Sequence, residues 1–147
     1  MTTLAADDLA RVDRLVEQFT RIGDERMRDL GLYNPALRVE AIGFRRWEGW
    51  LAGVLVTPWF MNFMLLPTAA EQLAGFAVGT KRRIEMPKGE VVFTIGEVEE
   101  IGPYAANSLH SPMGEFGDHL NAAARAWALV ETFFQEPKDE ATTPCGR

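Results

Sequence analysis

Apolar residues near the start of the chain recur at steps of three and four positions, which predicts an amphipathic helix from Leu9 to Leu30. The stripe consists of Leu9, Val12, Leu15, Val16, Phe19, Ile22, Met27 and Leu30. Asp7 and Asp8 precede it, where the helix dipole favours negative charge. Gly31 is placed to end the helix, since glycine is favoured just beyond a helix C-terminus.

A run of seventeen uncharged residues, 50–66, is the most apolar part of the chain. Pro58 interrupts it, because proline lacks a backbone donor and pushes Thr57 toward an extended conformation. β-Branched residues precede the break, so we predict two strands, Trp50–Thr57 and Phe60–Leu66. Both faces of both strands are apolar. They are therefore either central strands covered on both sides, or strands with one face left for a partner.

Two other interpretations of this run are less favourable. A membrane-spanning helix needs about 20 apolar residues, and this run is shorter and has a proline at its middle. An export signal would use the Arg45-Arg46 pair, but such signals stand at the N-terminus. Here the pair begins 44 residues after Met1, and Glu48 separates it from the apolar run.

The remaining elements are shorter and are separated by turn signals. We predict strands at 37–44, 81–86, 91–97 and 104–109, a turn at 45–49, and breaks at 87–89 and 102–103. Lys81-Arg82-Arg83 make 81–86 an edge strand. Thr68 can begin a short helix through Phe76 with Glu71 as its capping-box partner. Asp118 can begin a final helix that Pro137 stops. The predicted buried face of that helix is Leu120, Ala124, Trp127, Val130 and Phe134.

The order of helix, strands and helix predicts an α+β fold, in which N-terminal and C-terminal helices pack on a mostly antiparallel sheet. The length and apolar fraction fit one globular domain, residues 1–137, and the polar tail 138–147 is predicted to be disordered. The first eight residues lack the basic and apolar parts of a secretory signal, and Cys145 is the one cysteine. We therefore expect a cytoplasmic protein.

Charge and motifs argue against nucleic-acid binding and against most catalytic chemistry. The net charge of -6 disfavours phosphate-backbone binding, although it could attract a basic partner. No phosphate-binding glycine motif is present, and the spacing of His110 and His119 matches no metal site. Ser108, His110 and Asp118 have the residue types of a hydrolytic triad, without any local signature of one. A small hydrolase or ligand-binding enzyme that uses His110 is the alternative function.

Aromatic residues and carboxylates form the best candidate binding site in the sequence. Trp47 and Trp59 stand beside predicted turns, and Phe60 and Met61 follow Trp59. Core packing accounts for most aromatic residues, but such residues at an exposed groove form an adaptable binding surface. Glu97, Glu99 and Glu100 form an acidic group that is either an exposed turn or a docking point for arginine.

Three segments resemble the HybE-type nickel-iron hydrogenase assembly chaperones. They are GFRRWEGWLAGVLVTPWFMNFMLLP (43–67), MPKGEVVFTIGEVEEIGPY (86–104) and NSLHSPM (107–113). The centres of the three motifs are Thr57-Pro58-Trp59, Phe93-Thr94-Ile95-Gly96-Glu97, and Ser108-Leu109 with Ser111-Pro112. The resemblance covers about Leu9 to Phe134, and the order and spacing of the three motifs make it specific.

The resemblance implies a small cytoplasmic α+β protein without a cofactor or catalytic residues. Such proteins assist the maturation of membrane-bound uptake hydrogenases before twin-arginine export. The implied partner is a hydrogenase subunit precursor, with the small subunit favoured, and possibly other maturation factors. Some relatives carry a rubredoxin-like domain with paired cysteines, and the residues here contain no such pair.

Together these observations lead to one hypothesis about the site. The side chains of Trp47, Trp59, Phe60 and Met61 contact the apolar stretch of a signal peptide, and Glu97, Glu99 or Glu100 faces its arginine pair. A homodimer that uses the apolar face as its own interface is the structural alternative.

Overall fold

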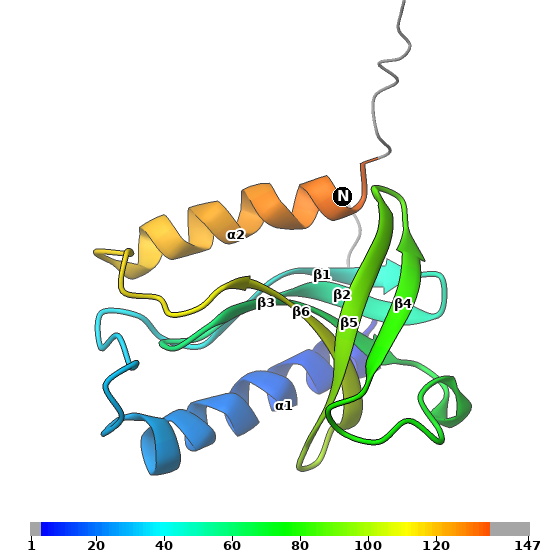
Figure 1. Cartoon of the computed structure of the whole chain (residues 1–147), viewed down its shortest axis with the longest axis horizontal. Coiled ribbons are helices and arrows are strands. Elements are labelled where there is room, and N and C mark those ends of the chain that lie inside the picture. Colours follow the sequence, from blue (N-terminus) through cyan, green and yellow to red (C-terminus); the bar gives the residue numbers. More distant parts are fainter. Residues whose placement is uncertain (1–3, 136–147) are drawn as a thin grey trace, which may run out of the picture.

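A six-stranded antiparallel sheet lies between two helices, as the computed structural model of residues 4–135 shows (Figure 1). The helices are α1 (Ala6–Ile22) and α2 (His119–Phe133), on opposite faces of the sheet. The strands are β1 (Glu40–Trp47), β2 (Trp50–Val56), β3 (Met61–Pro67), β4 (Lys81–Met86), β5 (Gly89–Val98) and β6 (Gly102–His110). This arrangement confirms the predicted α+β class. The predicted polar tail, Pro137 and Cys145 lie outside the described residues.

The strand order is β1-β2-β3-β6-β5-β4, and every neighbouring pair is antiparallel. Two three-stranded meanders are therefore joined side by side where β6 pairs with β3. In this order β2 and β3 are interior strands, and β1 and β4 form the two edges. The edge position of β4 agrees with its basic residues, which protect a free strand edge against unwanted pairing.

The sheet separates two apolar cores, one under each helix. The core under α2 includes Val54, Phe63, Phe93, Ile95 and Phe133. The core under α1 includes Leu15, Phe19, Leu51, Leu55 and Met64. Alternate residues of β2 and β3 point into opposite cores, which explains why both strands carry apolar residues on both faces. The run that could be mistaken for a membrane span is thus the centre of the sheet. No helix within residues 4–135 combines the length and apolarity that crossing a membrane requires.

The first strand lies three residues later than predicted, and the predicted turn at 45–49 is wrong. β1 continues through Trp47, and the turn consists of Glu48 and Gly49, which both have positive φ (48° and 85°). A two-residue turn of this kind matches the twist of the flanking strands. Gly43 (φ 69°) lies in a bulge at which the β1–β2 register shifts. Gly43 and Phe44 of β1 both lie opposite a single residue of β2 there.

The predicted helix 9–30 is also shorter than expected. α1 ends at Ile22, a π-helical turn (Gly23–Met27) follows, and Leu9 and Leu30 are half exposed rather than buried. The change from α-helix to π-helical turn falls at Gly23, against which the Trp59 ring packs. A Cβ at this position would lie 2.9 Å from Trp59 Cζ3, so any larger residue would displace the Trp59 ring.

The predicted short helix 68–76 is a single 3-10 turn (Ala70–Gln72). The predicted capping-box partner, Glu71, does not take that role. Instead, Gln72 Oε1 accepts hydrogen bonds from the backbone N–H groups of Thr68 (2.7 Å) and Ala69 (2.7 Å). The Gln72 side chain therefore satisfies both backbone donors at the start of this single turn.

The predicted buried face of the final helix is mostly wrong, although Asp118 caps α2 as expected by accepting from Asn121 N (2.9 Å). The face that meets the sheet consists of His119, Ala122, Ala126, Val130 and Phe133. Leu120 is 79% exposed and Trp127 is 50% exposed. Alanines make this helix apolar on several sides, so the sequence pattern does not select one face. The structure buries the face whose small Ala122 and Ala126 let the helix approach the sheet closely.

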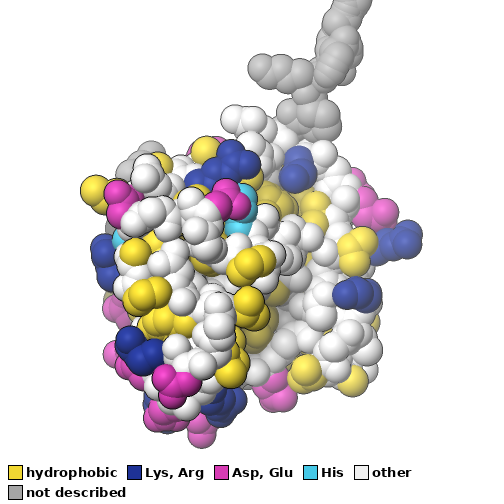
Figure 2. Space-filling model, turned by 60° about the vertical axis from the view of Figure 1, so that its left-hand side comes forward, with side chains coloured by type: hydrophobic (Ala, Val, Ile, Leu, Met, Phe, Trp, Pro, Cys, Tyr) yellow, Lys and Arg dark blue, Asp and Glu magenta, His cyan; other side chains and the backbone are white. Residues whose placement is uncertain are grey.

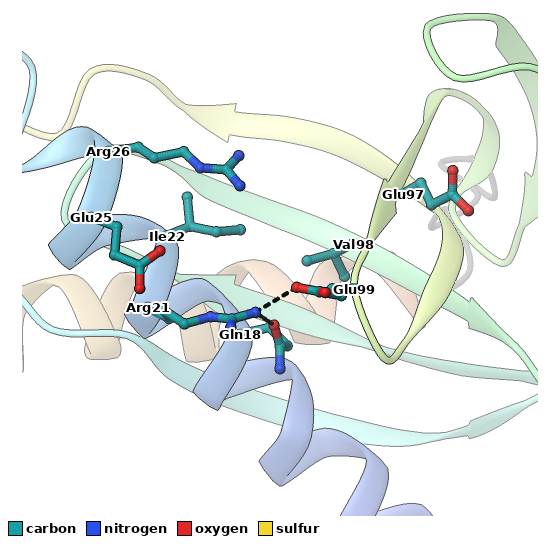
Figure 3. A pocket seen from close by; sticks show the side chains of 8 residues that line it. All are labelled: Gln18, Arg21, Ile22, Glu25, Arg26, Glu97, Val98 and Glu99. Carbon is teal, nitrogen blue, oxygen red and sulfur yellow. Dashed lines mark hydrogen bonds and ion pairs between the residues drawn. The ribbon is translucent and has the colours of Figure 1, made fainter.

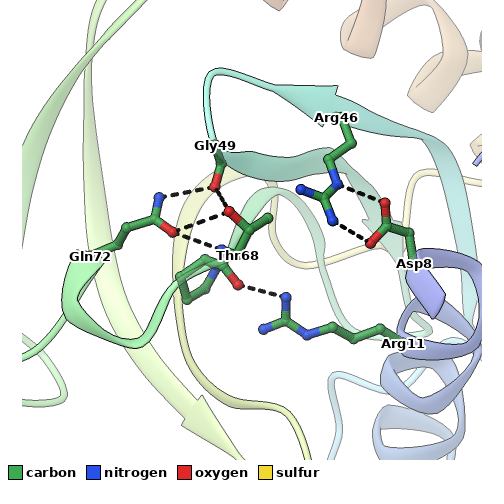
Figure 4. Close-up of polar contacts among 7 residues, drawn as sticks. Asp8, Arg11, Arg46, Gly49, Thr68 and Gln72 are labelled. Carbon is green, nitrogen blue, oxygen red and sulfur yellow. Dashed lines mark hydrogen bonds and ion pairs between the residues drawn. The ribbon is translucent and has the colours of Figure 1, made fainter. Parts of the chain in front are cut away.

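A polar network ties α1 to β1 and to the end of β3 (Figure 4). Arg46 Nε donates to Asp8 Oδ2 (2.6 Å), and Arg46 Nη2 donates to Asp8 Oδ1 (2.8 Å). Arg11 Nη1 donates to the carbonyl of Pro67 (2.6 Å). These hydrogen bonds from Arg46 hold the pKa of the buried Asp8 carboxyl below its usual value, against the desolvation that would raise it.

Asp8→Asn is therefore expected to lower the thermal unfolding temperature by a few degrees at neutral pH. A carboxyl whose pKa is lower in the folded state stabilises the fold above its unfolded pKa of about 4, and this contribution is lost as pH falls through the folded pKa. The difference between variant and wild type should shrink below about pH 4. Circular dichroism melts across pH measure it, with the exposed Asp7→Asn as control. A difference that stays constant down to acid pH would contradict the role of the pair.

Candidate binding surfaces

The four apolar side chains predicted to form one binding surface are divided by the fold among three places. Trp59 and Phe60 lie in the β2–β3 turn and are half-buried. Met61 is 0% exposed and belongs to the core, so it has no surface to offer a partner. Trp47 lies at the other end of the β1–β2 hairpin, where its ring meets Phe134 at 6.2 Å between centroids. Trp47 and Trp59 therefore cannot line one groove.

Trp59 and Phe60 begin a row of aromatic rings that continues under α1. Trp59 stacks on Tyr33 (6.3 Å between centroids) and meets Phe60 edge-on (5.5 Å). Phe60 meets Phe19 (5.7 Å), and Phe19 meets Tyr104 (6.3 Å). Burial raises the pKa of the Tyr104 hydroxyl. The inner part of the row is core, and its outer end, Tyr33 with Trp59, reaches the surface.

An apolar surface, which we call the loop-end surface, surrounds this outer end. It consists of Leu32, Tyr33, Pro35 and Pro112 around the largely buried Phe116. Leu32 is 55% exposed. A shallow pocket of about 330 Å³ lies between the two loops that carry these residues. Figure 2, turned to bring this end of the molecule forward, shows apolar side chains gathered across the face and most charged groups toward its margins.

Asn34 holds the loop-end surface together. Its Nδ2 donates to the carbonyls of Met113 (3.0 Å) and Phe116 (2.9 Å), and its backbone N–H donates to Pro58 O (2.8 Å). Three segments far apart in sequence are thereby joined. The prolines at 35 and 112 are turn signals in the sequence, but nothing in the sequence indicates that the two loops meet. For this reason Tyr33, Pro112 and Phe116 could not be found as site residues from the sequence alone.

The three predicted carboxylates follow one another from the end of β5 into the β5–β6 turn, and Glu97 and Glu99 line a pocket of about 190 Å³ against α1. In Figure 3, Glu99 faces Arg21, whereas Glu97 lies apart from the other labelled side chains. Arg21 Nη2 lies 2.7 Å from Glu99 Oε1 and also donates to Gln18. Arg14 Nε lies 3.7 Å from Glu100 Oε1. Glu97 lines the pocket with Glu25 and Arg26. Two of the three carboxylates are thus already engaged by arginines of the same chain, so the pocket is not a purely acidic receptor.

The residue types of a hydrolytic triad do not assemble. His110 Nδ1 lies 3.5 Å from Glu115 Oε1, and Arg125 Nε donates to His110 Nε2 at 3.4 Å. Asp118 is occupied as the cap of α2, and the hydrogen bonds of the described residues join neither Asp118 nor Ser108 to His110. His119 joins α2 to β1, since its Nε2 lies 2.7 Å from Glu40 Oε1 and its Nδ1 accepts from Arg38 N. Within residues 4–135, no group of three or more His, Cys, Asp or Glu side chains is arranged to hold a metal ion.

Comparisons of the sequence and of the structure with known proteins point to the same family. Residues 10–147 match the sequence model of the family described as NiFe-hydrogenase assembly, chaperone, HybE. The hydrogenase expression/formation protein HupJ of Bradyrhizobium diazoefficiens is 43% identical, over 97% of this chain and 87% of its own length. The probable rubredoxin HupJ of Rhodobacter capsulatus is 42% identical over 89% of this chain, but the match covers only 48% of that protein. The solution structure of HybE from Escherichia coli superposes with a TM-score of 0.69 at 22% identity, over 93% of this chain and 85% of that one.

Proposed function

Because this chain belongs to the HybE family of NiFe-hydrogenase assembly chaperones, we propose that it binds the precursor of a hydrogenase subunit, specifically a small subunit that still carries its twin-arginine signal. The protein acts by binding rather than by catalysis, and it does so in the cytoplasm, before the client is exported. Other maturation factors can join this complex. The family accounts for the chaperone role, and the proposal concerns the client and the way in which it is held.

The observation that carries the proposal is the loop-end surface. A contiguous apolar face on a globular domain marks an interaction site, since isolated exposed leucines are common but a rigid cluster with aromatic residues is not. Asn34 fixes the two loops, so the surface is present before a client arrives. An unfinished subunit exposes apolar segments that such a surface can cover. The net charge of -6 favours the approach of a client whose signal carries arginines.

Titration with a synthetic small-subunit signal peptide tests the proposal. The peptide should bind more tightly than a control in which lysines replace the arginine pair, because guanidinium binds carboxylates in a bidentate fork and lysine does not. We expect a severalfold difference in Kd by isothermal titration calorimetry. Equal affinity for both peptides would remove arginine recognition from the proposal.

A pair of surface variants tests which face binds. Leu32→Ser, on the loop-end surface, should weaken binding of the peptide severalfold, since it removes an exposed apolar contact. Val78→Ser changes a side chain that is 63% exposed just before β4 and should leave the affinity unchanged. If both variants bind like the wild type, the loop-end surface is not the contact.

A further inference from the structure

A second groove lies at the opposite end of β2, between the β1–β2 turn and the β4–β5 turn. Its volume is about 420 Å³, and it is lined by Trp47, Glu48, Trp50, Ile84, Glu85, Met86 and Pro87. We call it the hairpin groove. The curled sheet brings the tips of the two hairpins together at this end, as the ribbon shows (Figure 1).

The hairpin groove has an apolar floor and an acidic rim. Trp47 and Ile84 are half-buried, while Trp50 and Met86 are buried beneath them. Glu48 and Glu85 are exposed and are the two charged side chains among the lining residues. Neither carboxylate forms an ion pair within the described part of the chain. This groove therefore differs from the pocket of Figure 3, where arginines of α1 already meet the carboxylates.

The basic side chains nearest the hairpin groove already have partners within the chain. Arg46 is held by Asp8. Arg82 Nη1 donates to the carbonyl of Gln72, and its guanidinium lies 5.0 Å from the centroid of the Phe76 ring and 5.9 Å from that of Trp50, on the groove floor. Lys88 Nζ lies 4.1 Å from the centroid of the Phe133 ring. The rim thus keeps its negative charge available to a cation from outside.

The rim is also held in place before binding. The carbonyl of Gly49, next to Glu48, accepts from Gln72 Nε2 (3.0 Å) and from the Thr68 hydroxyl (Figure 4). The Trp47 ring is fixed by its edge contact with Phe134. A receptor whose parts are already ordered loses less conformational entropy when a ligand binds.

We propose that the hairpin groove receives the arginine pair of the client's signal. This inference rests on the proposed function and names the site that reads the arginines. A guanidinium is planar and weakly hydrated, so it can stack on the face of Trp47 while it donates a bidentate pair of hydrogen bonds to a carboxylate. With Glu48 and Glu85 on the rim, two arginines each have an acidic partner. The apolar floor accepts the side chains that flank them.

The distance between the two surfaces fits a single bound peptide. β2 has seven residues, so the hairpin groove and the Trp59 turn are roughly 20–25 Å apart along the strand. An extended peptide spans this distance with about seven residues, and the apolar part of a signal peptide has about 7–15. A signal peptide whose arginines occupy the hairpin groove can therefore reach the loop-end surface with its apolar stretch.

Two double variants with the same change in net charge test this assignment. The variant with Glu48→Gln and Glu85→Gln should bind the arginine peptide about tenfold more weakly than the wild type does. Its Kd values for the arginine peptide and the lysine control should then be nearly equal. The variant with Glu97→Gln and Glu99→Gln, at the pocket of Figure 3, should keep both the affinity for the arginine peptide and the preference for it over the lysine control. Circular dichroism melts verify that both proteins are folded, as expected for substitutions of exposed residues.

The outcomes separate the inference from the function on which it rests. If the wild type prefers the arginine peptide and the Glu48/Glu85 variant keeps that preference, the hairpin groove is not the receptor, although the proposed function stands. Loss of the preference in the Glu97/Glu99 variant alone would assign the arginines to the pocket beside α1 and overturn the inference. If the wild type binds neither peptide, the proposed client itself is wrong.

Discussion

Phe63→Ala is expected to lower the free energy of unfolding by about 3–5 kcal/mol, the largest effect of any substitution considered for this fold. Phe63 is fully buried in β3, and its ring stacks on Phe133 of α2 at 3.9 Å between centroids, with 5° between the planes. Phe93 of β5 and Phe134 contact the same ring. Truncation leaves a cavity where two strands and α2 meet, and neighbours in a packed core fill such a cavity only partly.

Thermal or urea unfolding measures this loss, which corresponds to roughly 10 °C or more in a domain of this size. Leu120→Ala is the matched control, since it removes an apolar side chain from α2 that is 79% exposed. It should change stability by no more than about 0.5 kcal/mol. Similar losses in the two variants would mean that α2 packs with the face containing Leu120, contrary to the structure.

Gly53→Ala should be the second most damaging change, although it adds a single methyl group. Gly53 lies in β2 opposite the bulge of β1, where two residues of β1 face one of β2. A Cβ at this position would lie 2.5 Å from Phe44 Cγ and 2.7 Å from Phe44 Cα. Because one of these atoms is backbone, rotation of the Phe44 side chain cannot relieve the clash. We expect a loss of about 1–3 kcal/mol or more.

Gly114→Ala is the control for this prediction, since a Cβ at 114 would meet no atom within 4 Å. Unfolding curves of both variants, recorded beside the wild type, give the comparison. A Gly53→Ala protein as stable as the wild type would show that the bulge at Gly43 and the close approach of Phe44 are not required by the sheet.

The central sheet could be predicted from the sequence because its signal is local. The charge-free run 50–66, broken by Pro58, has apolar residues on both faces, which predicts strands that are covered on both sides or have one face left for a partner. The structure confirms two interior strands between two cores. In the same way, Asp118 was identifiable as a helix cap, since an aspartate just before an apolar helix accepts a backbone hydrogen bond whatever the tertiary fold.

The parts that the sequence did not predict depend on contacts between distant residues. The α-helix passes into a π-helical turn at Gly23, and the Trp59 ring, 36 positions further along the chain, packs against that glycine. The buried face of α2 follows from how closely Ala122 and Ala126 let it approach the sheet, while its larger residues Leu120 and Trp127 remain exposed. A count of apolar residues favours the larger side chains, so it selects the wrong face.

The candidate site shows the same limit. Trp47 and Trp59 are close in sequence, but a hairpin strand carries them to opposite ends of the sheet. Glu99 and Glu100 looked free in the sequence, whereas Arg21 and Arg14 of α1 pair with them. Glu48 and Glu85 could not be identified from the sequence as site residues, because each becomes part of a groove only when the two hairpin tips meet.

Co-purification of the hydrogenase small-subunit precursor, with and without its twin-arginine signal, tests the central claim most directly. Cells that produce the tagged chain and the complete precursor should give a complex of the two, and deletion of the signal should reduce the recovered precursor by about tenfold or more, as expected when the central contacts of an interface are removed. Equal recovery of the precursor without its signal, or no recovery of the complete precursor, would contradict the account.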